Sequence, residues 1–311
     1  MKILKIALFA LVVCLTSCYE EYIQDYETTS MSFALKKPLR TVIADRDMSI
    51  YVGVSIGGKR EVDMKDWAKF TIDASLLAGT GLELLPADYY TLGDGEMMRV
   101  RKSNMPVADV EIKFTETFYT DPKCLGKHYA IPFRITECST DEIGEGADYS
   151  IVAIKYVSSF SGTYFVLGEC SELDGAGNIV STTSYNDKDL VANFTREVGS
   201  LSTKDLLRNG VANLAANATN RMKLTIGAPL NENGDYNVQA STADGGLTIL
   251  SGSGIYKAKG SYNFNSGDTP APEMDLNYEY QIGGVRYKVS EKLVLRRDPL
   301  DDLRIETWGA D

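Results

Sequence analysis

The chain has 311 residues, of which 44% are apolar and 24% charged. This composition excludes a disordered or fibrous protein and leaves room for about two domains of roughly 150 residues. The 43 acidic residues outnumber the 32 basic ones, so the chain lacks the basic surface by which proteins gather nucleic acid. The single histidine, His128, excludes metal sites built from several imidazoles and weakens any Ser-His-Asp interpretation.

The N-terminus has the pattern of a secretion signal. Lys2 and Lys5 precede an apolar run, Ile6 to Leu15, which is too short for a membrane-spanning helix of about 20 residues. The run ends in Leu15-Thr16-Ser17-Cys18, which is similar to a bacterial lipobox. We therefore expect residues 1–17 to be a lipoprotein signal peptide and Cys18 to be acylated, since several acyl chains give a stable anchor. An ordinary signal peptide followed by a chance cysteine is the alternative.

An acidic segment follows Cys18. Residues 18–30 contain Glu20, Glu21, Asp25 and Glu27 and show no apolar periodicity, which predicts a flexible tether. Acidic residues at this place resemble the signal that sends lipoproteins of gut Bacteroidota to the outer face of the outer membrane. The expected location is therefore the outer membrane, lipid-anchored and exposed at the cell surface. A plain solvated linker is the alternative.

Residues 31–157 alternate between short apolar runs and turn signals. Asp109 to Phe114, for example, places apolar side chains at every second position, as in a strand with one buried face. About seven strands and no long helix predict an immunoglobulin-like β-sandwich. The strands are expected at Met48 to Ile56, Lys69 to Ala74, Tyr89 to Leu92, Met98 to Arg101, Val107 to Phe114, Tyr129 to Glu137 and Ser150 to Val157.

Residues 158–311 form the second expected domain, which begins at the Ser158 to Gly162 stretch. Many strands with hairpin turns, such as the two-residue turn Gly283-Gly284, predict a lipocalin-like β-barrel. Only Ser202 to Ala216 has helical spacing, with Ser202 as the cap and Gly210 as a weakness. The fold class is therefore all-β, a sandwich plus a barrel with at most one short helix.

Three cysteines remain after Cys14 and Cys18. Cys124 and Cys138 could pair across adjacent strands, while Cys170 is left over. Three buried thiols are the alternative. No CxxC spacing is present, so the sequence gives no support for zinc or redox chemistry and predicts no cofactor and no metal.

Several segments resemble a family of Bacteroidota surface lipoproteins. In the first half they are Leu84 to Leu92, Val110 to Phe114 and Tyr129 to Ile135, which are similar to an N-terminal domain of unknown function. In the second half, segments such as Gly162 to Phe165 and Leu276 to Tyr280 resemble the β-barrel domain that often follows it. The resemblance implies a product of a polysaccharide-utilisation locus, which captures glycans beside an outer-membrane transporter complex. It assigns no binding residue.

The sequence itself offers aromatic side chains for sugar binding. Sugars pack their C–H faces on aromatic rings, while tyrosine and tryptophan also supply a polar group. The candidates near expected loops or strand ends are Trp67, Tyr185, Tyr256, Tyr262 and Trp308. Each could instead be a core residue. The predicted function is non-catalytic glycan binding as an accessory to polysaccharide capture and uptake.

Two other classes of function remain open. One is a structural or adhesive lipoprotein that makes protein–protein contacts at the outer membrane. The other is a glycoside hydrolase, which needs two carboxylates facing each other across the substrate. Asp94 and Glu96 are the most suggestive local pair, but Gly95 between them favours a solvated turn. No catalytic residue is therefore predicted.

Overall fold

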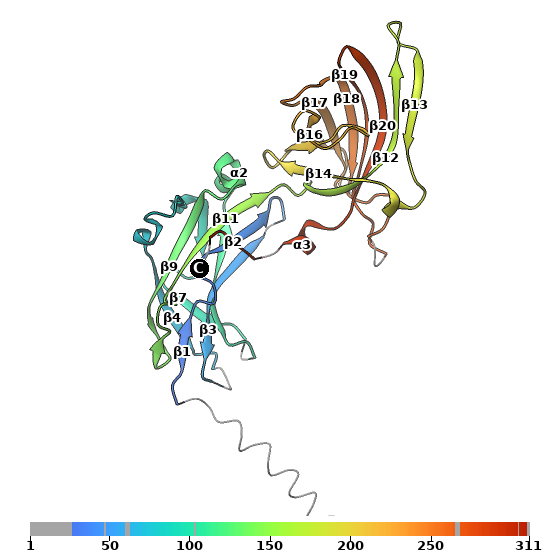
Figure 1. Cartoon of the computed structure of the whole chain (residues 1–311). Coiled ribbons are helices and arrows are strands. Elements are labelled where there is room, and N and C mark those ends of the chain that lie inside the picture. The colour runs from blue at the N-terminus through green and yellow to red at the C-terminus, as the bar shows by residue number, and fades with distance from the viewer. Residues whose placement is uncertain are drawn as a thin grey trace, which may run out of the picture.

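The computed structural model describes residues 27–309, except 47, 60–62, 103, 265–267 and 304. The expected signal peptide, Cys18 and most of the expected tether lie outside the described residues. Within the described part, the chain is almost entirely β-structure in two bodies, a first sheet and a closed barrel (Figure 1). No helix among the described residues is long and apolar enough to cross a membrane.

The first sheet has twelve strands among the described residues. Its strands are β1 (Ser30–Ser32), β2 (Pro38–Ile43), β3 (Ser49–Gly57), β4 (Trp67–Ile72), β5 (Glu83–Leu84), β6 (Tyr90–Leu92), β7 (Met97–Val100), β8 (Val107–Phe114), β9 (Tyr129–Cys138), β10 (Glu142–Ile143), β11 (Tyr149–Val157) and β21 (Glu306–Thr307). The main order is β10-β1-β3-β8-β7-β4-β9-β11-β2-β21. The loops carry α2 (Glu116–Thr120), η1 (Ala74–Leu77), η2 (Ala87–Tyr89) and η3 (Pro122–Leu125).

One apolar core joins the two ends of this sheet. Val54 on β3 and Ile112 on β8 belong to the same buried cluster as Phe133 on β9 and Ile154 on β11. Since β3 and β8 lie on one side of the strand order and β9 and β11 on the other, the sheet must fold over itself, as in a β-sandwich. The alternation expected for Asp109 to Phe114 is confirmed, because Val110 and Ile112 are buried while Lys113 is exposed.

The end of the chain returns to the first sheet. After the barrel, α3 (Pro299–Asp302) leads to β21, which pairs with Pro38 and Leu39 of β2. Trp308 then packs on a second cluster that includes Ile151, and its indole N–H donates to the Ile151 carbonyl at 2.8 Å. Residues 158–311 were expected to form the barrel domain. The barrel strands themselves span Gly162 to Leu295, and the last strand belongs to the sandwich.

The barrel closes eight antiparallel strands into a ring. They are β12 (Gly162–Leu173), β14 (Thr195–Ser200), β15 (Asp205–Asn209), β16 (Arg221–Pro229), β17 (Tyr236–Thr242), β18 (Thr248–Lys257), β19 (Glu273–Ile282) and β20 (Val285–Leu295). The expected turn Gly283-Gly284 joins β19 to β20, and both glycines adopt positive φ angles of 57° and 84°. That prediction is confirmed.

A further strand, β13 (Ile179–Tyr185), lies outside the ring. The first half of β12 pairs with β14, whereas its second half pairs with β13, so β13 leaves the barrel wall where β14 joins it. A loop with η4 (Leu190–Ala192) connects β13 back to β14. The β12–β13 hairpin runs along one side of the barrel (Figure 1).

The helix expected at Ser202 to Ala216 is wrong. Asp205–Asn209 is strand β15, in which Leu206 and Arg208 are buried at every second position. Ser202 does cap a turn, since its hydroxyl oxygen accepts from the Asp205 amide at 2.8 Å. The leucines happen to recur at helical spacing, but pairing with β14 and β16 makes this segment a strand.

The disulfide proposed between Cys124 and Cys138 is also wrong, because both are free thiols, as is Cys170. Cys124 lies in η3, just before β9, while Cys138 is the last residue of β9. Ten strand residues span roughly 33 Å, whereas a disulfide needs Cα atoms less than about 7 Å apart. The two cysteines lie near opposite ends of one strand rather than on neighbouring strands.

Candidate functional site

The interior of the barrel is filled by its own side chains. Apolar residues such as Met222 and Leu276 make up most of it. Among them, Arg208 and Glu291 form an ion pair whose side chains are both 0% exposed. Glu291 also accepts hydrogen bonds from the hydroxyl groups of Tyr278 at 2.8 Å and Tyr185 at 3.2 Å. The Glu291 carboxylate is therefore fully occupied, and the barrel interior offers it to no ligand.

Burial changes the pKa of both tyrosine hydroxyls. Burial, and then the neighbouring Glu291 charge, raises the pKa of both the Tyr278 and the Tyr185 hydroxyl well above the usual value. Both therefore stay protonated and can donate to the carboxylate. The network supports the barrel from inside, as a buried charge must be paired and hydrogen-bonded to be tolerated.

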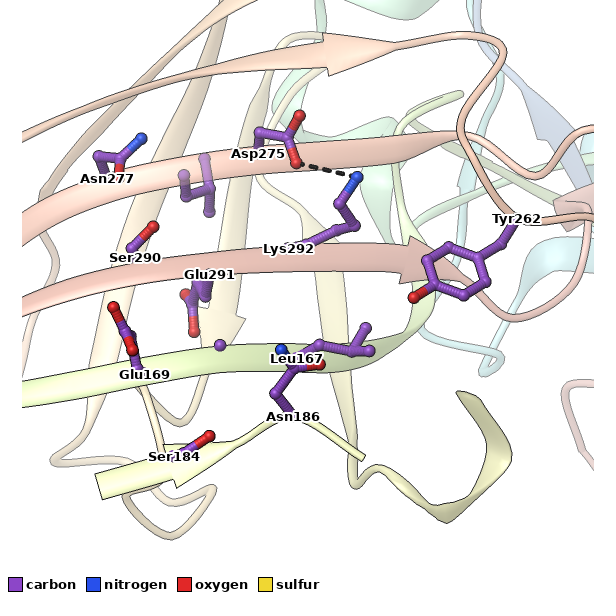
Figure 2. Close-up of a pocket in the computed structure, with 12 residues that line it drawn as sticks. Leu167, Glu169, Ser184, Asn186, Tyr262, Asp275, Asn277, Ser290, Glu291 and Lys292 are labelled. Carbon is purple, nitrogen blue, oxygen red and sulfur yellow. Dashed lines mark ion pairs between the residues drawn. The ribbon is translucent and has the colours of Figure 1, made fainter. Parts of the chain in front are cut away.

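A groove of about 580 Å³ lies on the opposite, outer face of the same strands. It forms near the point where β13 departs from the barrel, and the end of β13 lies beside β12, which is followed by β20 and β19 (Figure 2). Tyr262, from the loop between β18 and β19, stands at one end of the groove (Figure 2). The groove is lined by Leu167, Gly168, Glu169, Ser184, Asn186, Tyr262, Asp275, Leu276, Asn277, Ser290, Glu291 and Lys292.

Four of the polar residues stand in one row across neighbouring strands. Strand pairing aligns Ser184 with Glu169, Glu169 with Ser290 and Ser290 with Asn277. All four are exposed. Because paired strands lie about 4.8 Å apart, the row presents one hydrogen-bonding side chain per strand over roughly 14 Å. The sheet thus holds hydroxyl, carboxylate and amide groups at fixed, regular spacing.

The Tyr262 end of the groove holds a charge network. Lys292 Nζ lies 2.7 Å from Glu273 Oε1 and 3.3 Å from Asp275 Oδ1, and its side chain crosses toward Asp275 in Figure 2. Lys257 reaches the same two carboxylates at 3.5 Å and 2.5 Å. Ser261 donates both its amide and its hydroxyl to Glu273 Oε2, at 2.9 Å and 2.8 Å. This network ties the loop that carries Tyr262 to β19 and β20.

Glu273 is the buried centre of that network, with 1% of its surface exposed. Burial alone would raise the pKa of its carboxyl. The Lys292 ammonium and the two Ser261 donors outweigh burial and lower the pKa from 4.5 to about 2. Glu273 is therefore ionised across the physiological range and holds its partners in place.

Apolar side chains pack beneath the same loop. Phe165, Leu167, Ala271 and Val294 form a small buried cluster on the outer face of the barrel, and Tyr262 packs against it. The ring of Tyr262 is half-buried, so one part is held by the cluster while the rest lines the groove. An aromatic ring held in this way loses little conformational freedom on binding.

Of the five aromatic candidates, the structure places only Tyr262 at the groove. Tyr185 points to the barrel interior, and Tyr256 is a core residue whose ring packs edge-on against Phe160 at 4.8 Å between centroids. Trp67 begins β4 of the sandwich, and Trp308 is packed against the same body. The five residues therefore do not form one surface.

Sequence reasoning missed Glu169, Asn186, Asn277 and Ser290 as groove residues. Alternation within β19 and β20 could have placed Asn277 and Ser290 on the outer face, because their neighbours Tyr278 and Glu291 are buried. The Gly283-Gly284 turn could also have paired Asn277 with Ser290. The pairing of Glu169 with Ser290 joins β12 to β20, far apart in sequence, and no local signal reveals it.

Asp94 and Glu96, the carboxylate pair considered for hydrolysis, lie in a turn. Asp94 Oδ1 accepts from the amides of Glu96 and Met97, both at 3.0 Å. Asp174, in the turn between β12 and β13, is likewise hydrogen-bonded within its own turn. Its Oδ1 accepts from the Asn178 amide at 2.8 Å. Within the described residues, no group of three or more His, Cys, Asp or Glu side chains could hold a metal ion.

Comparison with known proteins agrees with the fold. A family model described as a "-like, N-terminal domain" matches residues 19–142, which is less than half of the chain. A solved protein of unknown function from Bacteroides ovatus has a TM-score of 0.71 and 20% identity over 91% of this chain and 100% of that one. At that identity the likeness shows the fold alone. No curated protein matches the chain.

A second solved structure is more distant. An auxiliary nutrient binding protein from Bacteroides thetaiotaomicron VPI-5482 has a TM-score of 0.42 and 12% identity, over 83% of this chain and 90% of that one. A likeness this weak assigns nothing to this chain.

Proposed function

We propose that the groove on the outer face of the barrel binds a glycan. The observation that carries this is the combination of one held aromatic ring, Tyr262, with a row of hydrogen-bonding side chains at strand spacing. A sugar ring can pack its C–H face on Tyr262 while its hydroxyls bond to groups such as Asn277 and Glu169. The family resemblance, which implies glycan capture, points the same way.

The groove favours binding over hydrolysis. A glycosidase needs two available carboxyl groups on either side of the bond to be cut. Of the three acidic residues in the groove lining, Glu291 has its carboxylate inside the barrel, fully bonded, and Asp275 is paired with two lysines. Only Glu169 remains open to a ligand. We therefore propose a non-catalytic role.

The proposed setting is the bacterial cell surface. We propose that Cys18 is acylated and that the acidic segment after it tethers the two β-bodies to the outer membrane. Metabolic labelling with a fatty-acid analogue should mark the wild-type protein and not the Cys18→Ala variant. Labelling of both proteins, or of neither, would contradict the anchor. External protease added to intact cells should then degrade a surface-exposed protein and spare a periplasm-facing one.

The binding proposal is tested by retention on immobilised glycans. The probe is a panel of plant, host and microbial polysaccharides in affinity electrophoresis, followed by calorimetry on the ligand that is retained. Tyr262→Leu keeps an apolar contact with the cluster below and removes the ring, so it should weaken binding about tenfold or more. Tyr51→Leu, at an exposed tyrosine of the sandwich, is the matched control and should bind as wild type.

The outcomes separate the functional classes. Equal retention of wild type and Tyr262→Leu would overturn the groove as the site. No retention on any glycan, together with capture of an outer-membrane transporter complex, would favour the structural or adhesive alternative. Release of reducing sugar from a panel member would favour the hydrolase.

A further inference from the structure

The charges around the groove select among glycans. The groove lining contains three acidic residues, Glu169, Asp275 and Glu291, and one cation, Lys292. Because the Glu291 carboxylate lies inside the barrel, paired with Arg208, the lining presents two carboxylates and one ammonium to a ligand. A ligand with its own negative charges would therefore need a cation that does not already serve the protein's own carboxylates.

Lys292 is already engaged by partners within the protein. Its ammonium donates hydrogen bonds to Glu273 Oε1 at 2.7 Å and to Ser261 Oγ at 3.2 Å, and it lies 3.3 Å from Asp275 Oδ1 in an ion pair. A ligand carboxylate or sulfate would have to compete with Glu273 and Asp275 for this one positive charge. Breaking the contact with Glu273 would leave a buried carboxylate short of a charge partner, which is costly.

Lys257 does not replace it. Its ammonium lies 2.5 Å from Asp275 Oδ2 and 3.5 Å from Glu273 Oε1, on the far side of the same carboxylates. Hydrogen bonding to Asp275, and the two negative charges, raise the pKa of Lys257, so its positive charge is fixed in the network. Both ammonium groups of this network therefore serve the protein's own carboxylates.

The other end of the groove is negative. Glu169 is exposed, and within the described part of the chain it has no ion-pair partner. Its neighbours in the row, Ser184, Ser290 and Asn277, are uncharged and can donate or accept hydrogen bonds. The chain as a whole carries a formal net charge of −11. The groove-lining side chains at this end therefore carry negative charge only, and the net charge of the chain has the same sign.

We infer that the groove takes a neutral glycan and rejects acidic ones such as uronate-containing or sulfated chains. This inference rests on the proposed function and narrows its substrate class. The row of serine, asparagine and carboxylate groups suits the hydroxyl groups of an uncharged sugar, whereas a carboxylate at the C6 position of a sugar would face Glu169 or Asp275 with no free cation among the groove-lining residues.

The test compares one backbone in two charge states. The neutral polysaccharide retained best by the wild-type protein is oxidised selectively at its primary alcohols, so that C6 becomes a carboxylate. Calorimetry at low salt should show that the oxidised form binds about tenfold or more weakly, and added salt should reduce the difference. Polygalacturonate and chondroitin sulfate, as native acidic chains, should not be retained.

Two variants assign the effect to the groove. Glu169→Gln should reduce the ratio between the affinities for the neutral and the oxidised form several-fold, both measured in the same variant. Glu232→Gln removes one exposed carboxylate in the turn between β16 and β17, away from the groove lining, and should leave this ratio as in wild type. Thermal melts of both variants should match wild type, because each side chain is exposed.

The outcomes keep this inference separate from the proposed function. Equal or tighter binding of the oxidised form, or retention of acidic chains alone, would overturn the inference while glycan binding stood. An equal reduction of the affinity ratio in Glu169→Gln and Glu232→Gln would assign the selectivity to net charge and overturn the role of the groove. Binding of no glycan at all would refute the proposed function itself.

Discussion

The two β-bodies use their interiors in opposite ways. The sandwich packs an apolar core such as Val54, Ile112 and Phe133 between the two halves of its sheet. The barrel instead buries a charged pair, Arg208 and Glu291, among its apolar side chains. An eight-stranded barrel is just wide enough for side chains to fill it. The barrel interior therefore serves the stability of the fold. The proposed site lies on the outer face, where β13 leaves the barrel wall.

The largest expected effect comes from breaking the buried pair of Arg208 and Glu291. Glu291→Leu leaves the Arg208 charge buried without a partner and should destabilise the barrel by about 3 to 5 kcal/mol. The chain's two tryptophans, Trp67 and Trp308, both belong to the sandwich, so their fluorescence reports that body alone. Urea unfolding should show an early far-UV circular-dichroism transition of the barrel with the tryptophan transition little changed.

The double variant Arg208→Met/Glu291→Leu is the control for that experiment. Replacing both charges with apolar groups should restore most of the lost stability. If the free energy of unfolding of the single Glu291→Leu variant lay within about 1 kcal/mol of wild type, well short of the loss expected for an unpaired buried charge, the buried pair would not be what supports the barrel.

The next effect concerns acid stability of the loop that carries Tyr262. The pKa of Glu273 is lowered to about 2, so its contribution is complete above the ordinary pKa of 4.5 and is lost as pH falls from 4.5 toward 2. The loss should reach up to about 3 kcal/mol. Glu273→Gln should remove this part of the pH dependence. A wild-type barrel transition as flat as that of Glu273→Gln between pH 5 and 3 would contradict the assignment.

A smaller effect tests the row of polar side chains. Asn277→Ala removes one amide from the middle of the groove and should weaken glycan binding by about 1 kcal/mol, the scale of one hydrogen bond. Asn237→Ala changes an exposed asparagine of β17 that does not line the groove, and should leave affinity unchanged. Equal losses of glycan affinity in the two variants, measured by calorimetry, would refute a role of the polar row in binding.

The smallest effects are expected at the cysteines, where alkylating agent and reductant should leave the folded protein unchanged. Burial and the nearby Asp121 charge raise the pKa of the Cys124 thiol to about 12, so it should resist alkylation in the folded protein. Reductant should not shift Tm, since neither Cys124 nor Cys138 is in a disulfide. A lower Tm in reductant would show a disulfide that the structure lacks.

Local patterns predicted much of the fold and little of the site. The turn Gly283-Gly284 and the alternation around Val110 depend on neighbouring residues only, and both were correct. The helix at Ser202 failed because pairing with the preceding and following strands, β14 and β16, overrode the leucine spacing. Tyr262 was found by residue type. Asn277 and Ser290 are paired within the hairpin that the Gly283-Gly284 turn sets, whereas their alignment with Glu169 depends on pairing between β12 and β20, which no local pattern encodes.

We propose that the outer wall of the barrel, rather than its interior or the sandwich, binds the glycan. Backbone chemical-shift mapping by NMR, with the retained neutral glycan at saturation, locates the site directly. We expect the largest shifts to cluster at Glu169, Ser184, Tyr262, Asn277 and Ser290. Shifts centred on the sandwich around Trp67, or on the interior around Arg208, would contradict it.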